Sequence, residues 1–377
     1  MSKIPKIQTT ANKGEWAEFY AHLKIICDQT IPAGDKNLES NPKINYPILA
    51  IFKKNLKYLL VDKQTLQLQS EGNINQNIQI LPVRNKLSSV FDGILSGSGN
   101  GAFSIIDGLQ LSQYLQLPIT NSQKIKSDID LELEDPNTQS IQKLGFSIKS
   151  KITAEATLVN ASLQTRFKFK LKNVTPEIIK IVNSTEGAGK IRKRIELLNT
   201  QNVDILSIGS KSSNFKLNLT NFDSVFDVIL GQMLLLSYCD QQVKVVNTKG
   251  TETTKLKSIK NILSIAQSSQ FYEYLTTYNL DPKIFINKLK DFLIAFALGM
   301  EPVKQWSGID DVDGGIIWVK KDGSMVCHHL FERKELKEYL FNNTFFETPS
   351  TSRHQFGFIY QEEDHCYFDL CLQIRFK

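Results

Sequence analysis

The first part of the chain carries apolar residues at the spacing of an α-helix. They recur at three- and four-residue intervals and so fall on one helical face. The residues are Trp16, Phe19, Tyr20, Leu23 and Ile26. Pro32 and Gly34 then end the pattern. We therefore predict a first helix over residues 13–29, on which Glu15 and Glu18 share a face because they are three positions apart.

Alternating apolar and polar residues predict two blocks of β-strands. Residues 46–52 and 57–61 have the pattern of a hairpin, and residues 126–135 (KSDIDLELED) have that of a strand. A turn through DPNTQSIQK leads to a further strand at residues 145–152 (GFSIKSKI). Because such strands are interspersed with helical segments, we predict an α/β fold in which a mixed β-sheet is flanked by helices.

The remaining segments continue this mixture, and no internal repeat or clear linker interrupts it. The further predicted helices are residues 85–95, 103–117, 175–200, 221–238, 258–300 and 332–341, with a short helix or turn at 154–162. The further predicted strands are residues 166–171, 203–209, 215–220, 316–320, 356–360 and 367–376.

Length, composition and charge bound the class of protein. The 377 residues suit one large domain or two intimately joined domains. With 41% hydrophobic and 22% charged residues, the chain can bury a full core, which excludes the disordered class. The formal net charge of +6 permits binding to a polyanion without demanding it.

The cysteines and the apolar runs indicate a cytoplasmic protein. The five cysteines are scattered and form no CxxC pair: Cys27, Cys239, Cys327, Cys366 and Cys371. We expect reduced thiols rather than disulfides or a zinc site. The first residues lack the apolar stretch of a signal peptide, and no run of 18 or more apolar residues predicts a membrane span.

Asp128 and Lys149 are the first residues that suggest chemistry. Asp128 opens one predicted strand, and Lys149 lies on the next strand, where it shares a face with Ser147. A lysine on a largely apolar strand needs a partner, which a carboxylate of the neighbouring strand can supply. Phosphodiester hydrolysis uses this arrangement, because carboxylates hold Mg²⁺, bound water is activated, and a lysine stabilises the developing charge. The alternative is that two structural strands carry these residues by chance.

One acidic residue is missing from the nuclease pattern that this stretch resembles. In the PD-(D/E)xK motif, an acid precedes the lysine by two positions, and here that position is Ser147. Serine is a poor Mg²⁺ ligand, so a second carboxylate must come from elsewhere. Glu18 or Glu15 on the first helix is the first choice, and Glu155 is the alternative. Asp130 lies on the same face of its strand as the first aspartate and could replace it.

Short segments along the whole chain resemble the HpaII-like family of type II restriction endonucleases. In order, they are NKGEWAEFY (12–20), KSDI (126–129), GFSIKS (145–150), TLVNAS (157–162), ETPSTSRHQFGFIY (347–360) and LQIRF (372–376). The resemblance implies a site-specific deoxyribonuclease of a restriction–modification system with a PD-(D/E)xK-like core and Mg²⁺ as cofactor. It also implies double-stranded DNA as the substrate, cut at a short palindromic site like the CCGG of the namesake.

The resemblance carries roles onto matching positions. Asp128 and Lys149 become the catalytic pair, with Glu18 and Ser147 completing the catalytic set, and Ser147 agrees with the family's string. Mg²⁺ would be held by Asp128 with Glu18 or Glu15. Residues 1–175 would form the nuclease core, and residues 176–377 would hold DNA-recognition elements and the rest of the core. A palindromic site would suit a homodimer, and a cognate DNA methyltransferase would be a genetic rather than a physical partner.

Two polar clusters are candidates for DNA contact. The first is a basic run in a predicted helix: Lys190, Arg192, Lys193 and Arg194. Such a run is either a solvated face or a set of phosphate contacts. The second follows Pro349: Ser350, Thr351, Ser352, Arg353 and His354. It is either a polar turn or a DNA-contacting loop, in which Arg353 could grip a guanine.

Other motifs have simpler interpretations. The string GAGK at 187–190 departs from a phosphate-binding P-loop, because Ser184 stands where glycine is required and Ile191 where serine or threonine is required. His328 and His329 are adjacent on a predicted strand and point to opposite faces, so we expect structural roles rather than a metal site.

Three classes of function remain open on the sequence. The first is a restriction endonuclease. The second is a sequence-specific DNA-binding protein with a degenerate nuclease site, which the serine at position 147 makes conceivable. The third is an unrelated α/β scaffold. Cleavage of a plasmid with Mg²⁺ separates the first class from the others, and DNA binding in Ca²⁺ separates the second from the third.

Overall fold

The computed structural model divides the chain into two compact units. It describes residues 10–70, 73–97, 101–120, 127–136, 138–152, 156–246 and 252–377. The first unit is Met1–Ala156 with Asp310–Tyr339, and the second is Thr157–Ile309 with Leu340–Lys377. The chain therefore leaves the first unit, builds most of the second, and returns to the first for one short excursion.

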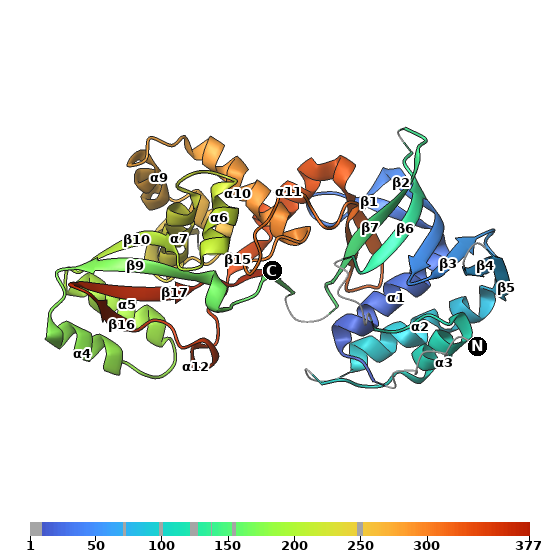
Figure 1. Cartoon of the computed structure of the whole chain (residues 1–377), viewed down its shortest axis with the longest axis horizontal. Helices are drawn as coiled ribbons and strands as arrows, with labels where there is room; N and C mark the ends of the chain where they lie inside the picture. Colours follow the sequence, from blue (N-terminus) through green and yellow to red (C-terminus); the bar gives the residue numbers. More distant parts are fainter. Residues whose placement is uncertain are drawn as a thin grey trace. The chain divides into compact units, whose positions relative to one another are not determined.

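The first unit is built on one mixed sheet of nine described strands. Its strand order is β1-β14-β13-β7-β6-β2-β3-β4-β5. The strands are β1 (Thr30–Gly34), β2 (Ser40–Lys53), β3 (Leu56–Leu60), β4 (Thr65–Ser70), β5 (Asn73–Gln79), β6 (Ile129–Glu134), β7 (Ile141–Ser150), β13 (Gly315–Val319) and β14 (Met325–His329). Helices α1 (Lys13–Asp28), α2 (Leu81–Ser96) and α3 (Ile106–Leu115) gather on one side of it (Figure 1). Helix α11 (Arg333–Asn342) crosses the boundary between the units.

Helix α1 forms where the apolar periodicity predicted it. Asn12 caps its N-terminus, accepting a hydrogen bond from the Glu15 backbone N–H, while the Glu15 side chain accepts one from the backbone N–H of Asn12. Trp16, Phe19 and the other apolar residues of one face are buried in the core of the first unit. This packing fixes α1 against α2 and β7.

The register of β6 and β7 places the predicted catalytic strands side by side. They pair antiparallel with Ile129 opposite Phe146, so Asp128 falls opposite Ser147 just before β6 begins. On its other edge β7 pairs with β13 in parallel, and Lys149 is level with Trp318. The predicted strands at 126–135 and 145–152 are confirmed, as is the hairpin now seen as β2 and β3.

The second unit contains three smaller sheets, ordered β10-β9-β17-β16, β15-β18-β8 and β11-β12. Helices α6 and α7 pack on β10, whereas α4 contacts β16 (Figure 1). The strands are β8 (Thr157–Val159), β9 (Arg166–Lys172), β10 (Asp204–Ser210), β11 (Asp240–Val246), β12 (Glu252–Ser258), β15 (Thr344–Phe346), β16 (Ile359–Glu362), β17 (His365–Cys371) and β18 (Ile374–Phe376). The helices are α4 (Pro176–Ser184), α5 (Lys190–Thr200), α6 (Ser213–Thr220), α7 (Phe226–Leu236), α8 (Ile262–Ala266), α9 (Ser269–Thr276), α10 (Pro282–Ala297) and α12 (Thr351–His354).

Two local predictions were wrong. Residues 215–220 form most of α6 rather than a strand, because Ser212 caps the helix and Phe215 and Leu219, four positions apart, bury one face. The alternating run at residues 215–220 is short enough to fit either the two-residue period of a strand or the 3.6-residue period of a helix. The segment predicted as a short helix or turn at 154–162 contains β8, which pairs with β18 far along the chain.

The two units differ from a division at residue 175. Residues 157–175 belong to the second unit, and residues 310–339 return to the first, where β13 pairs with β7 and β14 with β1. Both of these pairings are parallel and join segments far apart in the sequence. Such long-range pairings leave no local pattern in the sequence. The sequence analysis therefore grouped β13 and β14 with residues 176–377.

The structure also bears on the expectations for the cysteines, for membrane-spanning helices and for the adjacent histidines. All five cysteines, which fall in the described part of the chain, are free thiols. Over the described ranges, no helix is long and apolar enough to cross a membrane. His328 Nδ1 accepts a hydrogen bond from the Trp318 indole at 2.9 Å, and His329 stacks on Tyr46. The adjacent histidines therefore have structural surroundings, as expected.

Candidate active site

The Asp128 carboxylate is held in place by the strand beside it. Its Oδ2 accepts hydrogen bonds from the Ile148 backbone N–H at 2.7 Å and from the Ser147 hydroxyl at 3.1 Å. The Asp128 backbone N–H donates to the Phe146 carbonyl at 2.9 Å. Ser147, which is 4% exposed, therefore orients the aspartate rather than standing in for a missing acid.

Lys149 lies on the same strand face as these polar groups. Phe146 and Ile148 are buried in the core, and Ser147 and Lys149 alternate with them. Because Asp128 is opposite Ser147, the side chains of Asp128, Ser147 and Lys149 share this face. Lys149 is half-buried, so part of this residue remains exposed.

Glu18 approaches this pair from helix α1. Burial, followed by the nearby negative charge of Asp128, raises the pKa of Glu18 to about 7, while the positive charges of Lys53 and Lys149 pull it down. Helix α1 packs on β7, so the charges of both members of the predicted catalytic pair act on Glu18. The structure thus brings together Glu18, Asp128 and Lys149 from three elements.

Glu15 has a different local position. Its carboxylate accepts the Asn12 backbone N–H at 2.7 Å and so completes the cap of α1. Its charge also contributes to the raised pKa of Glu18. Of the two glutamates proposed from the sequence, Glu18 is therefore the one whose pKa responds to the charge of Asp128, and Glu15 supports the start of the helix.

Lys53 is a site residue that the sequence analysis did not single out. It ends β2, is only 8% exposed, and donates from Nζ to the Asp128 carbonyl oxygen at 2.9 Å. Burial lowers the pKa of Lys53, while the charges of Glu18 and Asp128 raise it. A buried lysine beside two carboxylates is typical of functional sites. In the sequence it is the first of two lysines before a turn, a pattern typical of solvated residues.

His22 completes the buried side of the cluster. One turn after Glu18 on α1, its Nδ1–H donates to the Glu18 carbonyl at 2.8 Å. Burial, reinforced by the charge of Lys53, lowers the pKa of His22 to about 3, so the ring is neutral at physiological pH. Its Nε2 is buried without a hydrogen-bond partner among the described residues.

The two other carboxylates proposed from the sequence do not replace these groups. Asp130 accepts a hydrogen bond from the Ser127 hydroxyl at 2.7 Å, and its charge acts on Lys53. Asp128, not Asp130, is the aspartate that acts on Glu18. Glu155 lies outside the described residues.

The site fits a hard divalent cation held by two carboxylates. Among the described residues, no three His, Cys, Asp or Glu side chains are grouped closely enough to hold a metal by themselves. Mg²⁺ does not require such a cage, because one or two carboxylates with waters and phosphate oxygens suffice. The negative charges of Glu18 and Asp128 disfavour each other, and a cation bound by both would relieve that repulsion.

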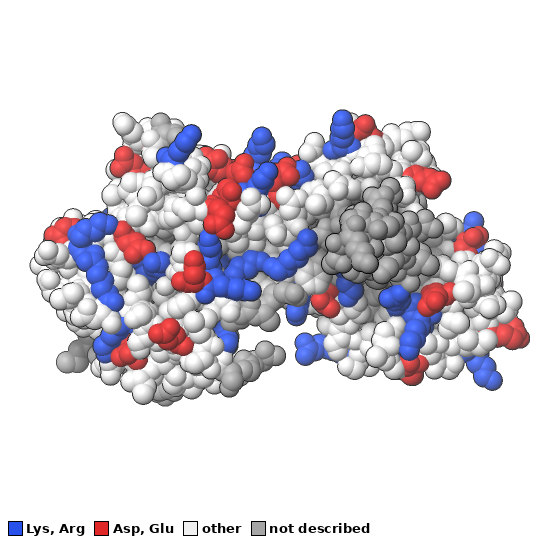
Figure 2. All heavy atoms as spheres, turned by 180° about the vertical axis from the view of Figure 1, so that it is seen from behind, with Lys and Arg blue, Asp and Glu red and all other residues white. Residues whose placement is uncertain are grey.

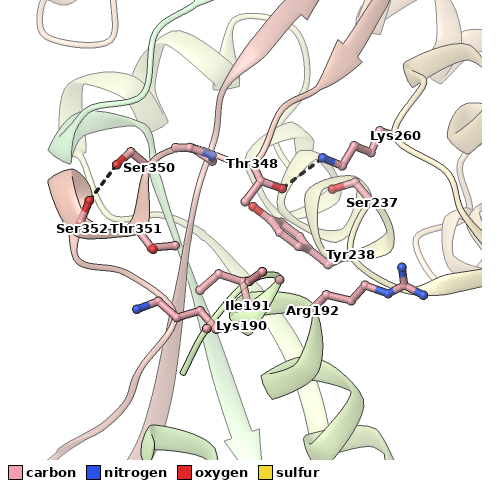
Figure 3. Close-up of a pocket in the computed structure, with 14 residues that line it drawn as sticks. Lys190, Ile191, Arg192, Ser237, Tyr238, Lys260, Thr348, Ser350, Thr351 and Ser352 are labelled. Carbon is pink, nitrogen blue, oxygen red and sulfur yellow. Dashed lines mark hydrogen bonds between the residues drawn. The ribbon is translucent and has the colours of Figure 1, made fainter. Parts of the chain in front are cut away.

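The second unit brings both candidate DNA-contact clusters around one cavity. This cavity has a volume of about 500 Å³, and its lining includes Lys190 and Arg192 of α5 together with Ser350, Thr351 and Ser352 (Figure 3). The two segments are about 160 positions apart in the sequence. On the face shown in Figure 2, Lys and Arg side chains are mixed with Asp and Glu side chains. This face is therefore not of one charge sign throughout.

Arg194 has to be removed from the predicted DNA-contact set. Its side chain is 0% exposed, and its guanidinium donates to the carbonyls of Thr185 and Gly357 and pairs with Glu186. An arginine that uses its donors in this way stabilises the fold and cannot reach a phosphate. The helical period places it on the inner side of α5, three positions after Ile191.

The other candidates stay accessible. Lys193 and Arg353 are exposed, whereas His354 is half-buried and its carbonyl accepts a hydrogen bond from Arg166. Ser350 caps the short helix α12, which carries Arg353, by accepting its backbone N–H. The string after Pro349 is therefore a capped helical turn with Arg353 on its surface.

The sequence is similar to known restriction endonucleases over nearly its whole length. The sequence matches the HpaII restriction endonuclease family over residues 12–376, from α1 to β18. It is 34% identical over 374 residues to the type II restriction enzyme HpaII of Haemophilus parainfluenzae, covering 97% of this chain and 98% of that enzyme. No solved structure matches the chain. The resemblance predicted from short segments is confirmed, and the chain belongs to the HpaII family of restriction endonucleases.

Proposed function

We propose that this chain is a Mg²⁺-dependent type II restriction endonuclease with a site of the PD-(D/E)xK kind. It hydrolyses phosphodiester bonds of double-stranded DNA at a short palindromic site, CCGG-like by family resemblance. The observation that carries the proposal is the packing of α1, which bears Glu18, on β7, which bears Lys149 and binds Asp128 just before β6. Family membership supports the class of reaction, and this cluster supports where in the chain it occurs.

In this proposal Asp128 and Glu18 hold the cation. Asp128 enters the site already oriented, because Ser147 and Ile148 fix one of its oxygens. When bound, Mg²⁺ would neutralise the scissile phosphate and lower the pKa of a water molecule. The serine at position 147 then takes the role of orienting the aspartate, and the second carboxylate comes from the helix instead of the strand.

The two lysines have separate roles. Lys149 is half-buried on the face of Asp128, where its positive charge stabilises the negative charge that develops on the phosphate. Lys53 is buried and bound to the Asp128 carbonyl, so it cannot reach substrate in the same way. It instead offsets the charge of the carboxylates and fixes the start of β6.

Plasmid cleavage tests the proposal. Purified protein should convert supercoiled plasmid to defined fragments with Mg²⁺ and leave it intact with EDTA, and sequencing of the ends gives the site. Lys149→Ala should lose cleavage by several orders of magnitude, while its affinity for duplex DNA in Ca²⁺ stays near that of the wild type. Retained cleavage in that variant would move the active site elsewhere.

The same assay separates the alternative function. A sequence-specific DNA-binding protein with a degenerate nuclease site would bind a defined duplex in Ca²⁺ but leave plasmid intact in Mg²⁺. The hydrogen bond from Ser147 to Asp128 argues against degeneracy, because it preserves an oriented carboxylate at the position where the motif needs one.

A further inference from the structure

We propose that the cavity of the second unit holds one phosphate of the DNA backbone, with Lys260 as a principal contact. The inference rests on the proposed function, since it takes DNA as the ligand. It adds residues that the sequence analysis did not consider: Lys260, Tyr238 and the loop 187–189. It also assigns the cavity to affinity rather than to sequence recognition.

The chemistry of the lining favours an anion. Three of the lining side chains are cationic, namely Lys190, Arg192 and Lys260. Four more carry aliphatic hydroxyls, namely Thr348, Ser350, Thr351 and Ser352, whereas the hydroxyl of a fifth, Ser237, already donates to the Leu234 carbonyl. No aspartate or glutamate is among the lining residues that the structure describes. Phosphate oxygens are strong acceptors that pair with such ammonium, guanidinium and hydroxyl donors.

The glycine loop leaves its backbone open to the cavity. Gly187 and Gly189 have φ of 91° and 71°, which only glycine adopts easily, and a Cβ on either would meet nothing within 4 Å. Gly189 is also the N-cap of α5 and offers no side-chain cap. The first N–H groups of this helix are therefore available to the cavity, where they favour negative charge.

Tyr238 adds a buried hydroxyl to the edge of the cavity. It is 5% exposed, its hydroxyl makes no hydrogen bond of good geometry to a described residue, and Thr348 is the neighbouring side chain that acts on it. Figure 3 shows the ring projecting to the side of the cavity where Thr348 lies. A buried hydroxyl whose contact with its neighbour has poor geometry gains from a better acceptor, which a phosphate oxygen in the cavity would supply.

The cavity is better suited to a phosphate than to a base. A base removed from the duplex is normally held between aromatic rings, whereas the lining residues that the structure describes include one aromatic side chain, the buried Tyr238. Lys260 donates to the Thr348 hydroxyl at 3.2 Å, and the Ser350 and Ser352 hydroxyls are 3.1 Å apart (Figure 3). These contacts place hydrogen-bond donors around the cavity. They do not form the paired donor and acceptor arrangement that recognises the edge of a base.

Lys260 is the cleanest probe of this site. Lys190 already pairs with Glu186 at 2.7 Å, so its loss would disturb two charges. Lys260→Met keeps the apolar stem and removes only the ammonium group. Lys283→Met is the matched control, because Lys283 is exposed in the same unit and lies outside the cavity lining. Equal unfolding temperatures of the three proteins establish that the fold is unchanged.

Binding is measured in Ca²⁺ on the cognate duplex and on a random duplex, each at two salt concentrations. Lys260→Met should weaken both complexes by roughly tenfold, and the slope of log affinity against log salt should fall by about 1. Lys283→Met should match the wild type. Weaker binding to the cognate duplex alone would overturn the proposal, because it would mean that Lys260 reads sequence.

A scan of single methylphosphonate substitutions locates the phosphate. The wild type should lose affinity when one particular phosphate is neutralised, and Lys260→Met should show no further loss at that position. An identical profile in both proteins would overturn the inference while leaving DNA cleavage, and so the proposed function, intact.

A third arm separates a DNA phosphate from a free anion. If inorganic phosphate raises the unfolding temperature of the wild type but not of Lys260→Met, and the methylphosphonate profiles are identical, the cavity takes a free anion and the inference is wrong. A wild type that binds no duplex at all would overturn the proposed function and the inference with it.

Discussion

Lys53 is the residue of the candidate active site whose surroundings most need explanation. Lysine is rarely buried unless it is paired, and Lys53 is 8% exposed. Its partners are the Asp128 carbonyl and the charges of Glu18 and Asp128. A cation in this position reduces the repulsion between two carboxylates while no metal is bound. It also ties the end of β2 to the residue that opens β6.

Replacement of Lys53 should therefore impair DNA cleavage without changing the affinity for DNA. Lys53→Met leaves the two carboxylates without their buried counter-charge and frees the Asp128 carbonyl, so we expect cleavage to fall roughly 10- to 100-fold, as for loss of a charged hydrogen bond. Affinity for duplex DNA in Ca²⁺ should stay within about twofold. Lys54→Met is the control, since its neighbour Lys54 is exposed in the turn and lies outside the cluster. If both variants cleave at the wild-type rate, Lys53 has no part in the site.

Glu18 makes the stability of the metal-free protein depend on pH. Its pKa is raised from 4.5 to about 7, so the folded state favours the protonated form. This contribution to stability is complete below pH 4.5 and is lost as the pH rises to about 7. Glu18→Gln imitates the protonated form, so in EDTA it should unfold several degrees above the wild type at pH 8. At pH 5 the two proteins should unfold together.

The same Glu18→Gln variant should lose Mg²⁺-dependent cleavage, because an amide is a weak ligand for this cation. A gain of stability with a loss of activity is the signature of a strained functional site. Equal unfolding temperatures at pH 8 would mean that Glu18 is solvated, and would contradict its assignment to the cluster.

At the scale of elements, the local patterns predicted what local physics controls. Helix α1 could be predicted because its apolar period and its cap lie within one short segment. Strands β6 and β7 could be predicted because they alternate and are joined by a turn, which placed Asp128 beside the strand of Lys149. Glu18 or Glu15 could be proposed because nuclease cores often place an acidic residue on the first helix, although the choice of Glu18 required the packing of α1 on the sheet.

Non-local pairings were beyond the sequence. The parallel pairings of β13 with β7 and of β14 with β1 leave no periodic signal, and they decide which residues make up the first unit. Lys53 was missed for a related reason, since its burial depends on α1 and β6 and not on its neighbours. Arg194 was assigned to the surface because its run is basic, but the phase of α5 turns it inward.

The element that carries Arg353 is suited to reading sequence. Helix α12 is a single turn capped by Ser350, and Arg353 is exposed on it. A guanidinium has the donor geometry to bind a guanine bidentately, a contact worth about 1–3 kcal/mol of discrimination. Arg353→Ala should therefore weaken binding to the cognate duplex about 10- to 100-fold while random DNA is bound nearly as before.

The contrast between two side chains of the second unit sharpens this prediction. Lys260→Met is expected to act on both duplexes, and Arg353→Ala on the cognate duplex alone, in the same assay at the same salt concentrations. Lys180→Ala, an exposed position on α4, serves as control. Equal losses on both duplexes would make Arg353 a phosphate contact, and base reading would then have to be sought elsewhere in the second unit.

At the scale of the whole molecule, one chain offers one catalytic cluster for a substrate with two strands. Among the described residues, the candidate active site of Glu18, Asp128 and Lys149 lies in the first unit. A palindromic duplex presents two scissile phosphates related by a two-fold axis, and a symmetric pair of chains can cleave both at once.

We therefore expect two chains per cognate duplex, measured as the mass of the complex in Ca²⁺ by light scattering. A mixture of wild type with excess Lys149→Ala should then nick plasmid rather than cut both strands, because most wild-type chains are paired with an inactive one. A complex with a single chain, or complete double-strand cleavage by the mixture at the rate of its wild-type fraction, would mean that one chain cuts the strands in turn.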